Sequence, residues 1–209
     1  MEDVLDVYQR PDSLKQPLVC IDEASKQQVQ ETRPRLPAQP GAPERYDYEY
    51  QRNGVSNLFM MVAPLRGWRE VRVTDQRSAV AWAHCRKELS DVHFPEADKL
   101  TVVMDNLNTH TPASFYQAFA PEEARRLAQR FEFHYTPKHG SWRNRAEIEL
   151  SVMQQQCLNR HIPDQPAMKA ETRAWTEQRN RSATKTDWRF TTKDARIKLK
   201  RLYPTFTTC

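Results

Sequence analysis

The sequence predicts an α/β fold in which helices cover a mixed β-sheet. Strand-like segments at 18–23, 55–64 and 69–75 precede the first helical pattern, and strand-like segments at 99–105 and 131–136 then alternate with helical ones. A group of strands followed by alternation favours a sheet with both antiparallel and parallel neighbours. A chain of 209 residues is also long enough for one domain with a sizeable core.

The expected strands differ in their patterns. Residues 18–23 (LVCIDE) form an apolar run that ends in acids, which is typical of a buried strand with carboxylates at its C-terminal end, and 99–105 (KLTVVMD) repeats that pattern. Residues 55–64 indicate another buried strand. Residues 69–75 alternate as its hairpin partner would, with Arg66-Gly67 in the turn.

A proline-rich segment separates the first two strands. Its prolines recur at a spacing of three, namely Pro34, Pro37, Pro40 and Pro43. This period matches polyproline II, so 33–44 is expected to be extended and free of helix. Tyrosines and acids alternate over 46–50, a pattern that favours a half-exposed strand.

Several segments have helical patterns. An apolar stripe of Trp82, Cys85 and Leu89 predicts an amphipathic helix over 78–92. The proline and two acids that begin at Pro121 are typical of a helix N-terminus. The full set of expected helices is 78–92, 111–119, 121–130, 142–160, 165–180 and 191–202.

Composition narrows the class of protein. Apolar residues make up 38% of the chain and charged residues 28%, as in a globular protein, and no apolar run approaches the roughly 20 residues that span a bilayer. The acidic N-terminus lacks the apolar segment of a signal peptide, so a cytoplasmic location is expected. The four cysteines have no CxxC spacing, which argues against a zinc site or a disulfide framework.

Positive charge gathers at the C-terminal end. Residues 169–209 hold eleven Lys or Arg and four Asp or Glu, a local balance of +7 in a chain whose net charge is +5. Such a segment suits a polyanion such as DNA. A solvated helix face would explain the same charges equally well.

Carboxylates form the candidate site. Asp22 and Asp105 both end apolar strand runs, and hard divalent cations need oxygen ligands of this kind. A third acid would have to come from a helix facing the sheet. Glu147 and Glu149 flank the apolar stripe of the 142–160 helix on opposite sides, each about 70–90° from its centre at roughly 100° per residue, so helical geometry does not choose between them.

Longer motifs carry a family resemblance. The stretches VCIDE (19–23), YDYEYQRNGVSNLFM (46–60), VVMDNLNTH (102–110) and FHYTPKHGSWRNRAEIELSVM (133–153) resemble transposases of the mariner superfamily, in the bacterial branch named after insertion sequence 630. The resemblance implies a ribonuclease-H-like fold. It also implies a catalytic triad of Asp22, Asp105 and Glu147, selecting Glu147 over Glu149, that binds two Mg²⁺ or Mn²⁺ ions.

The resemblance further implies phosphodiester hydrolysis and strand transfer at transposon ends by a dimer bound to DNA. The residues expected near the DNA phosphates are Lys138, His139, Arg143, Asn144 and Arg145. Only 17 residues precede the first expected strand, so the chain resembles the catalytic half alone of such a transposase: one product of a split gene, a truncated copy or a fragment, with a separate helix-turn-helix protein as a partner in the first case. The alternatives are an idle transposase remnant that at most binds DNA, and a structure-specific nuclease of the same fold.

The expected organisation has three parts. Residues 1–17 form a leader, residues 18–162 form the catalytic domain, and residues 163–209 form a basic helical extension of that domain. The 41 residues between Asp105 and Glu147 exceed the usual spacing in the family, and the helical segment 121–130 accounts for the extra length.

Overall fold

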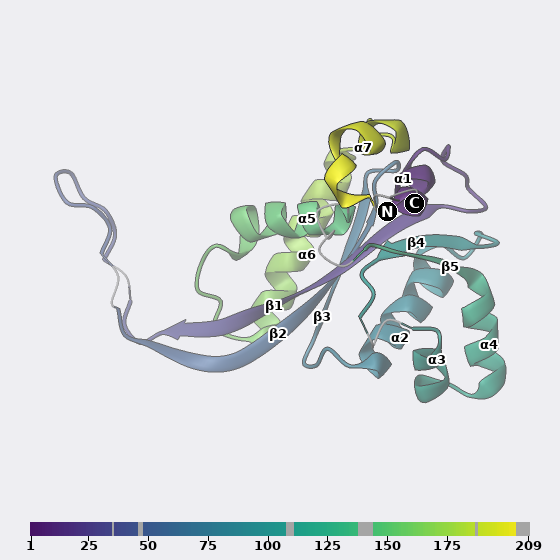
Figure 1. Cartoon of the computed structure of the whole chain (residues 1–209). Helices are drawn as coiled ribbons and strands as arrows, with labels where there is room; N and C mark the ends of the chain where they lie inside the picture. The colour runs from purple at the N-terminus through teal and green to yellow at the C-terminus, as the bar shows by residue number, and fades with distance from the viewer. Residues whose placement is uncertain (35, 46–47, 108–110, 138–143, 187, 204–209) are drawn as a thin grey trace.

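The computed structural model describes residues 1–34, 36–45, 48–107, 111–137, 144–186 and 188–203. Its centre is a five-stranded sheet in the order β3-β2-β1-β4-β5 (Figure 1). The strands are β1 (Leu18–Glu31), β2 (Tyr50–Ala63), β3 (Trp68–Thr74), β4 (Leu100–Met104) and β5 (Phe131–Tyr135). β1 pairs antiparallel with β2 and parallel with β4, so the predicted mixed sheet is confirmed.

Helices cover both faces of the sheet. They are α1 (Glu2–Tyr8), α2 (Ala79–Glu88), α3 (Ala113–Ala118), α4 (Pro121–Arg130), α5 (Arg145–Met153), α6 (Gln165–Ser182) and α7 (Thr192–Lys198), with π-helical turns η1 (Leu89–His93) and η3 (Gln154–Leu158) and a 3-10 turn η4 (Lys200–Leu202). In Figure 1, α2, α3 and α4 lie on one side of the sheet, and α5 and α6 lie on the other. No helix in the described part of the chain is long and apolar enough to cross a bilayer.

Along each strand, alternate side chains pack into two separate hydrophobic cores. Val19, Ile21 and Met104 pack with α2, α3 and α4, whereas Cys20 and Val103 pack with α5 and α6. This division follows from the period of two along a β-strand. The apolar segments of the sequence therefore form a sheet that is buried on both faces near its centre.

The hairpin of β1 and β2 is longer than its apolar segments indicate. β1 runs to Glu31, so Asp22 lies within the strand, and the expectation that it ends a strand at residue 23 is wrong. Polar side chains hold the extension together, because Ser25 Oγ donates to Asn57 Oδ1 at 2.7 Å and Gln28 bonds the Ser56 hydroxyl. Hydropathy gives no signal for such pairs.

The segment between these strands is extended. Its described residues contain no helix, as predicted for 33–44, and isolated bridges join Leu36 to Arg45 and Gln39 to Ala42. The strand expected over 46–50 is wrong for 48–49, because β2 begins only at Tyr50, and 46–47 lie outside the described residues.

Most other predicted elements are confirmed within a few residues of their ends. Gly67 forms the β2–β3 turn at φ +64°, where an added Cβ would lie 2.5 Å from the Ala183 carbonyl carbon. The first seventeen residues contain a helix that the sequence analysis did not anticipate. This helix, α1, buries Val4, Leu5 and Val7 and packs against β5 and α7.

A buried ion cluster joins the third strand to the helices above it. The Arg69 guanidinium donates to both Glu149 carboxylate oxygens, with Nε to Oε2 at 2.8 Å and Nη2 to Oε1 at 3.0 Å. Arg179 of α6 donates to the same carboxylate at 3.0 Å. Arg69 is fully buried, so this carboxylate supplies the countercharge that allows a cation to stay in the core.

We predict that Glu149→Ala lowers the free energy of unfolding by about 3–5 kcal/mol, because it leaves the Arg69 cation buried without a countercharge. Urea unfolding of the variant and the parent measures the loss. Glu88→Ala is the matched control, since it breaks the exposed pair with Arg72 and should cost at most about 1 kcal/mol. Equal losses in the two variants would contradict a structural role for the cluster.

Candidate active site

Two predicted site residues lie on neighbouring parallel strands. Cys20 of β1 pairs with Val103 of β4, and the same register continued by two residues brings Asp22 beside Asp105. Cys20 and Val103 face the α5 layer, so the alternation of side chains turns both aspartates toward that layer as well. Asp105 directly follows the end of β4.

Asn144 fixes the helix that carries the third acid. Its side-chain amide donates to the Ile21 carbonyl at 2.7 Å, and its side-chain oxygen accepts from the Ala146 amide at 3.1 Å. The second bond caps the N-terminus of α5, and the first ties that end to the strand residue beside Asp22. Glu147 lies in the first turn of α5 and is therefore held next to the two aspartates.

The electrostatics confirm that these carboxylates interact. Burial, together with the negative charges of Asp105, Glu147 and Glu23, raises the pKa of Asp22 to about 6, against a hydrogen bond from the Glu23 amide that lowers it. One buried oxygen of Glu147, Oε2, has no hydrogen-bond partner among the described residues. This group of carboxylates is thus rich in negative charge, and the protein fills only part of its hydrogen-bonding capacity.

The structure distinguishes the two glutamates that helical geometry left equivalent. Glu149 is buried, and its carboxylate is occupied by Arg69 and Arg179, which together lower its pKa against the effect of burial. Glu147 is partly exposed and lies near Asp22. Of the two, Glu147 is the one whose carboxylate is placed to bind a ligand.

Three further charged residues, Glu23, Arg77 and Arg86, lie near this group, and no motif in the sequence pointed to them. Glu23 points to the opposite face from Asp22, with its carboxylate 3.3 Å from Arg77 Nε. Arg86 of α2 is fully buried, lies 5.1 Å from the centre of the Trp82 ring, and has no hydrogen-bond partner for its guanidinium among the described residues. Burial lowers the Arg86 pKa to about 10, while Cys85, Glu23 and Asp105 counter that shift. The guanidinium thus places positive charge behind the acids.

Five residues were predicted to contact DNA phosphates, and the structure describes two of them. Asn144 and Arg145 are buried, and the Arg145 guanidinium packs 4.8 Å from the Trp188 ring and 5.5 Å from the Tyr8 ring. Both side chains thus have structural contacts within this fold, and their contact with DNA stays a prediction. Lys138, His139 and Arg143 lie outside the described residues.

The chemistry of the group fits a hard divalent cation. Carboxylate oxygens are the ligands that magnesium and manganese prefer, and a cation would offset both the burial and the neighbouring negative charges that raise the Asp22 pKa. The unsatisfied Glu147 oxygen also fits a ligand role. Within the described part of the chain, however, no three acid, histidine or cysteine side chains already converge as a complete ligand set.

We predict that Asp22→Asn stabilises the metal-free protein at pH 8 by about 1–2 kcal/mol, since each unit of pKa shift corresponds to about 1.4 kcal/mol and Asp22 is partly exposed. The folded pKa of about 6 exceeds the usual 3.8, so the folded state binds a proton that the unfolded chain lacks between those values. The parent therefore gains stability as the pH falls through this window, and the advantage of the variant disappears near pH 4.

Thermal unfolding from pH 4 to pH 8 tests this prediction, with Asp98→Asn, an exposed acid, as the control. A variant that is less stable than the parent at pH 8 would contradict the proposed repulsion. Mg²⁺ should stabilise the parent more than the Asp22 variant.

Comparison with known proteins agrees with this geometry. Solved structures of similar fold include a Mos1 mariner paired end complex with Mn (TM-score 0.52, 15% identity, covering 84% of this chain and 52% of that one) and a Mos1 strand transfer complex (TM-score 0.54, 14% identity, 83% and 50%). A Mos1 transposase paired-end complex with the left transposon end gives a TM-score of 0.53 at 18% identity and covers 92% of this chain and 56% of that one.

This chain spans about half the length of those Mos1 chains, and their likeness concerns the fold, which is that of ribonuclease-H-like transposases. No curated protein matches the sequence. The family model described as "DDE superfamily endonuclease" matches residues 17–169, a range that contains Asp22, Asp105 and Glu147. Since that match covers well over half of the sequence, the chain belongs to the DDE superfamily of endonucleases.

Proposed function

We propose that this chain is the catalytic domain of a transposase of the mariner superfamily, in the branch named after insertion sequence 630, and that it cleaves and joins DNA at transposon ends. The observation that supports the proposal is that Asp105 and Glu147 lie near enough to Asp22 for their negative charges to raise its pKa. The Mos1 structures of the same fold include a strand transfer complex and a paired-end complex with the left transposon end, which supports DNA as the substrate.

Asp22, Asp105 and Glu147 would hold two Mg²⁺ or Mn²⁺ ions. When bound, such ions activate the attacking oxygen and stabilise the leaving oxygen of a phosphodiester. The protein's own contribution is to position the carboxylates. β1 and β4 run parallel beside Asp22 and Asp105, and Asn144 ties the start of α5, which carries Glu147, to β1. We expect this arrangement to bring the third carboxylate within reach of the ions.

The reaction has two displacements at phosphorus. In the first, the oxygen of a water bonds to the phosphorus at the transposon end, the water's proton leaves, and the released oxygen becomes a 3′-hydroxyl. In the second, that hydroxyl attacks a target phosphodiester and frees a 3′-hydroxyl of the target strand. Both steps need alignment and neutralisation of charge more than covalent help from side chains.

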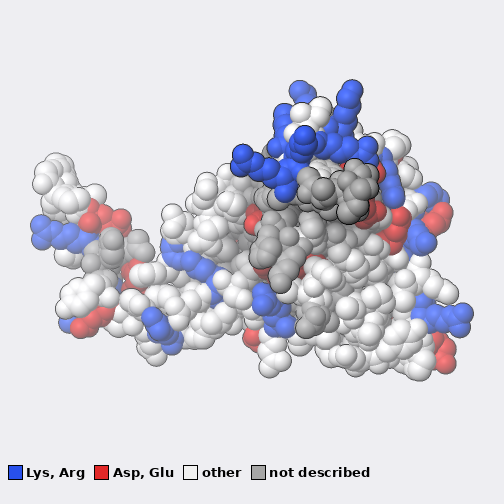
Figure 2. All heavy atoms as spheres, in the orientation of Figure 1, with Lys and Arg blue, Asp and Glu red and all other residues white. Residues whose placement is uncertain are grey.

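The C-terminal helix supports the binding of a polyanion. Figure 2 shows Lys and Arg gathered at the top of the molecule, where α7 lies in Figure 1. This basic patch consists of the exposed Lys193, Arg196, Lys198, Lys200 and Arg201. Arg196 pairs with Glu2 at 2.7 Å, so the other cations carry most of the free charge. We infer that the patch binds DNA backbone outside the catalytic group.

The partners proposed here follow from the chemistry of transposition. Two transposon ends have to be brought together, so a dimer on DNA is proposed, and a separate helix-turn-helix protein would read the end sequence. Both partners are proposed because the chain is proposed to be a transposase, and both would be withdrawn with that proposal.

We predict that Asp105→Asn and Glu147→Gln each reduce metal-dependent DNA cleavage and strand transfer at least 100-fold, because each removes a metal-binding charge. Activity is measured on labelled transposon-end duplexes with Mg²⁺ or Mn²⁺, and metal binding is measured separately by calorimetry. Asp98→Asn and Glu122→Gln are matched controls on exposed acids.

Undiminished activity in either site variant would overturn the assignment. Cleavage without any strand transfer would instead identify a structure-specific nuclease. Failure of the parent to bind metal or cleave DNA, with its fold intact, would favour an idle remnant.

We predict that the double variant Lys193→Gln, Lys200→Gln binds duplex DNA more weakly and with a shallower salt dependence. Each phosphate contact that is lost lowers the slope of log affinity against log salt by about 0.9, so a fall of about 1–2 is expected. Fluorescence anisotropy between low and moderate salt measures the slope. Lys99→Gln with Arg125→Gln, outside the basic patch, should leave it unchanged.

A further inference from the structure

The outer edge of β3 is open over part of its length. β3 is the last strand of the sheet on its side and pairs only with β2 among the described strands. At Arg69 the edge is closed, because Asn180 of α6 accepts from the Arg69 amide at 2.8 Å and donates to the Arg69 carbonyl at 2.8 Å. A side-chain amide here imitates the pairing of a neighbouring strand.

The register fixes the direction of the next groups along this edge. β2 and β3 pair without a shift from Asn57–Thr74 to Ala63–Trp68, and outward main-chain groups recur at every second residue of an antiparallel pair. Since Arg69 faces outward, the amides and carbonyls of Val71 and Val73 face outward too. The Glu70 carboxylate interacts with the Val71 amide, and no strand of the described chain pairs with either residue on this side.

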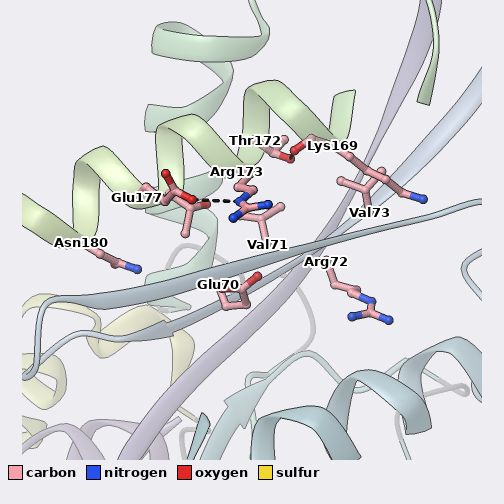
Figure 3. Close-up of a pocket in the computed structure, with 10 residues that line it drawn as sticks. Glu70, Val71, Arg72, Val73, Lys169, Thr172, Arg173, Glu177 and Asn180 are labelled. Atoms are coloured by element: carbon pink, nitrogen blue, oxygen red, sulfur yellow. Dashed lines mark hydrogen bonds and ion pairs between the residues drawn. The ribbon is translucent and has the colours of Figure 1, made fainter. Parts of the chain in front are cut away.

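A groove of about 510 Å³ runs along this open edge (Figure 3). Its floor is β3 from Glu70 to Val73, and its wall is one face of α6. The wall residues recur at the three- and four-residue spacing of a helix face, namely Lys169, Thr172, Arg173, Thr176, Glu177 and Asn180. The groove therefore lies parallel to a strand whose hydrogen-bonding groups face into it.

Two wall residues carry polar groups that the described residues leave unmatched. The Thr176 side chain lines the groove at only 6% exposure, yet its hydroxyl has no hydrogen-bond partner there. Thr172, one turn earlier, bonds the Met168 carbonyl at 2.8 Å. Lys169 has no carboxylate within ion-pair distance in the described structure, whereas Arg173 pairs with Glu177 at 2.9 Å. A buried hydroxyl without a partner costs stability, which points to a ligand that satisfies it.

We propose that this groove binds an extended, acidic peptide segment of a partner protein, which pairs with β3 as an additional strand of the sheet. Addition of a strand to a sheet edge uses main-chain hydrogen bonds for affinity and side-chain pockets for specificity. An acid on the segment would meet Lys169, and a polar group on it would bond the Thr176 hydroxyl.

The pattern of groups on the edge favours a peptide over nucleic acid. The Val71 amide already meets the Glu70 carboxylate, so the edge offers the Val71 carbonyl together with the amide and carbonyl of Val73, and a peptide main chain supplies complements to donors and acceptors alike. A phosphate accepts hydrogen bonds and would face the two carbonyls unfavourably.

The test uses fluorescein-labelled peptides of about six residues, the usual length of a strand, in which Val alternates with Glu and Thr. Binding to the whole chain is followed by anisotropy, and its location by the amide resonances of Val71 and Val73. Peptides N-methylated on one hydrogen-bonding edge should lose affinity, and peptides methylated on the other edge should keep it.

Matched variants separate edge pairing from general binding. Val73→Pro removes an outward amide that bonds no neighbouring strand, so it should weaken binding at least tenfold while the fold persists. Lys169→Glu should weaken binding of the acidic peptide and strengthen binding of a peptide with Lys in place of Glu. Lys185→Glu, at an exposed residue beyond the groove, should change neither affinity. Thr176→Val should weaken peptide binding more than Thr172→Val does.

Three results would overturn the proposal. The first is no binding by any of these peptides at millimolar concentration to a folded chain. The second is displacement of bound peptide by duplex DNA in the groove, which would assign it to nucleic acid. The third is a dimer of this chain that forms through β3 and is broken by Val73→Pro.

Discussion

Carboxylates that repel one another are held close together near the centre of this sheet, and the surrounding structure supplies the restraint. The parallel register of β1 and β4 brings Asp22 beside Asp105, and the bond from Asn144 to the Ile21 carbonyl brings the first turn of α5 to the same place. The pKa of Asp22 is raised first by burial and then by the neighbouring negative charges, so both oppose its ionised form. A bound cation would favour the ionised form, so this geometry, unfavourable in the metal-free fold, fits the proposed metal site.

The cations around α5 determine which of its two acids is available. Arg69 and Arg179 neutralise Glu149 in the core, so the helix is fixed in rotation as well as at its N-terminus. With Glu149 bound in this way, Glu147 is turned toward Asp22. Arg86 places a further buried positive charge behind Glu23 and Asp105, and this charge offsets part of the repulsion without occupying the face where Asp22 lies.

Hydropathy predicted the strands well because their buried segments are apolar on both faces, and it placed Asp105 correctly at the end of β4. It misplaced Asp22 because β1 continues through polar pairs such as Ser25 with Asn57. The choice of Glu147 over Glu149 needed the family resemblance, since the deciding partner, Arg69, is distant in sequence and only the fold brings it near. Arg145 was expected at DNA because its charge is visible in the sequence, whereas the rings of Tyr8 and Trp188 that bury it come from opposite ends of the chain.

The helix α5, which carries Glu147, and the open edge of β3 are held by the same group of side chains. Asn180 closes the β3 edge at Arg69, and the side chain of that same Arg69 holds Glu149 on α5. One turn of α6 thus bonds the strand that forms the floor of the groove, and through Arg179 it also bonds the helix that carries Glu147. A segment that pairs with Val71 and Val73 would contact both sides of this connection, because β3 lies beneath it and α6 lies beside it. Order gained along the groove would therefore be passed to α5 by hydrogen bonds that already exist, without a new contact at the carboxylates.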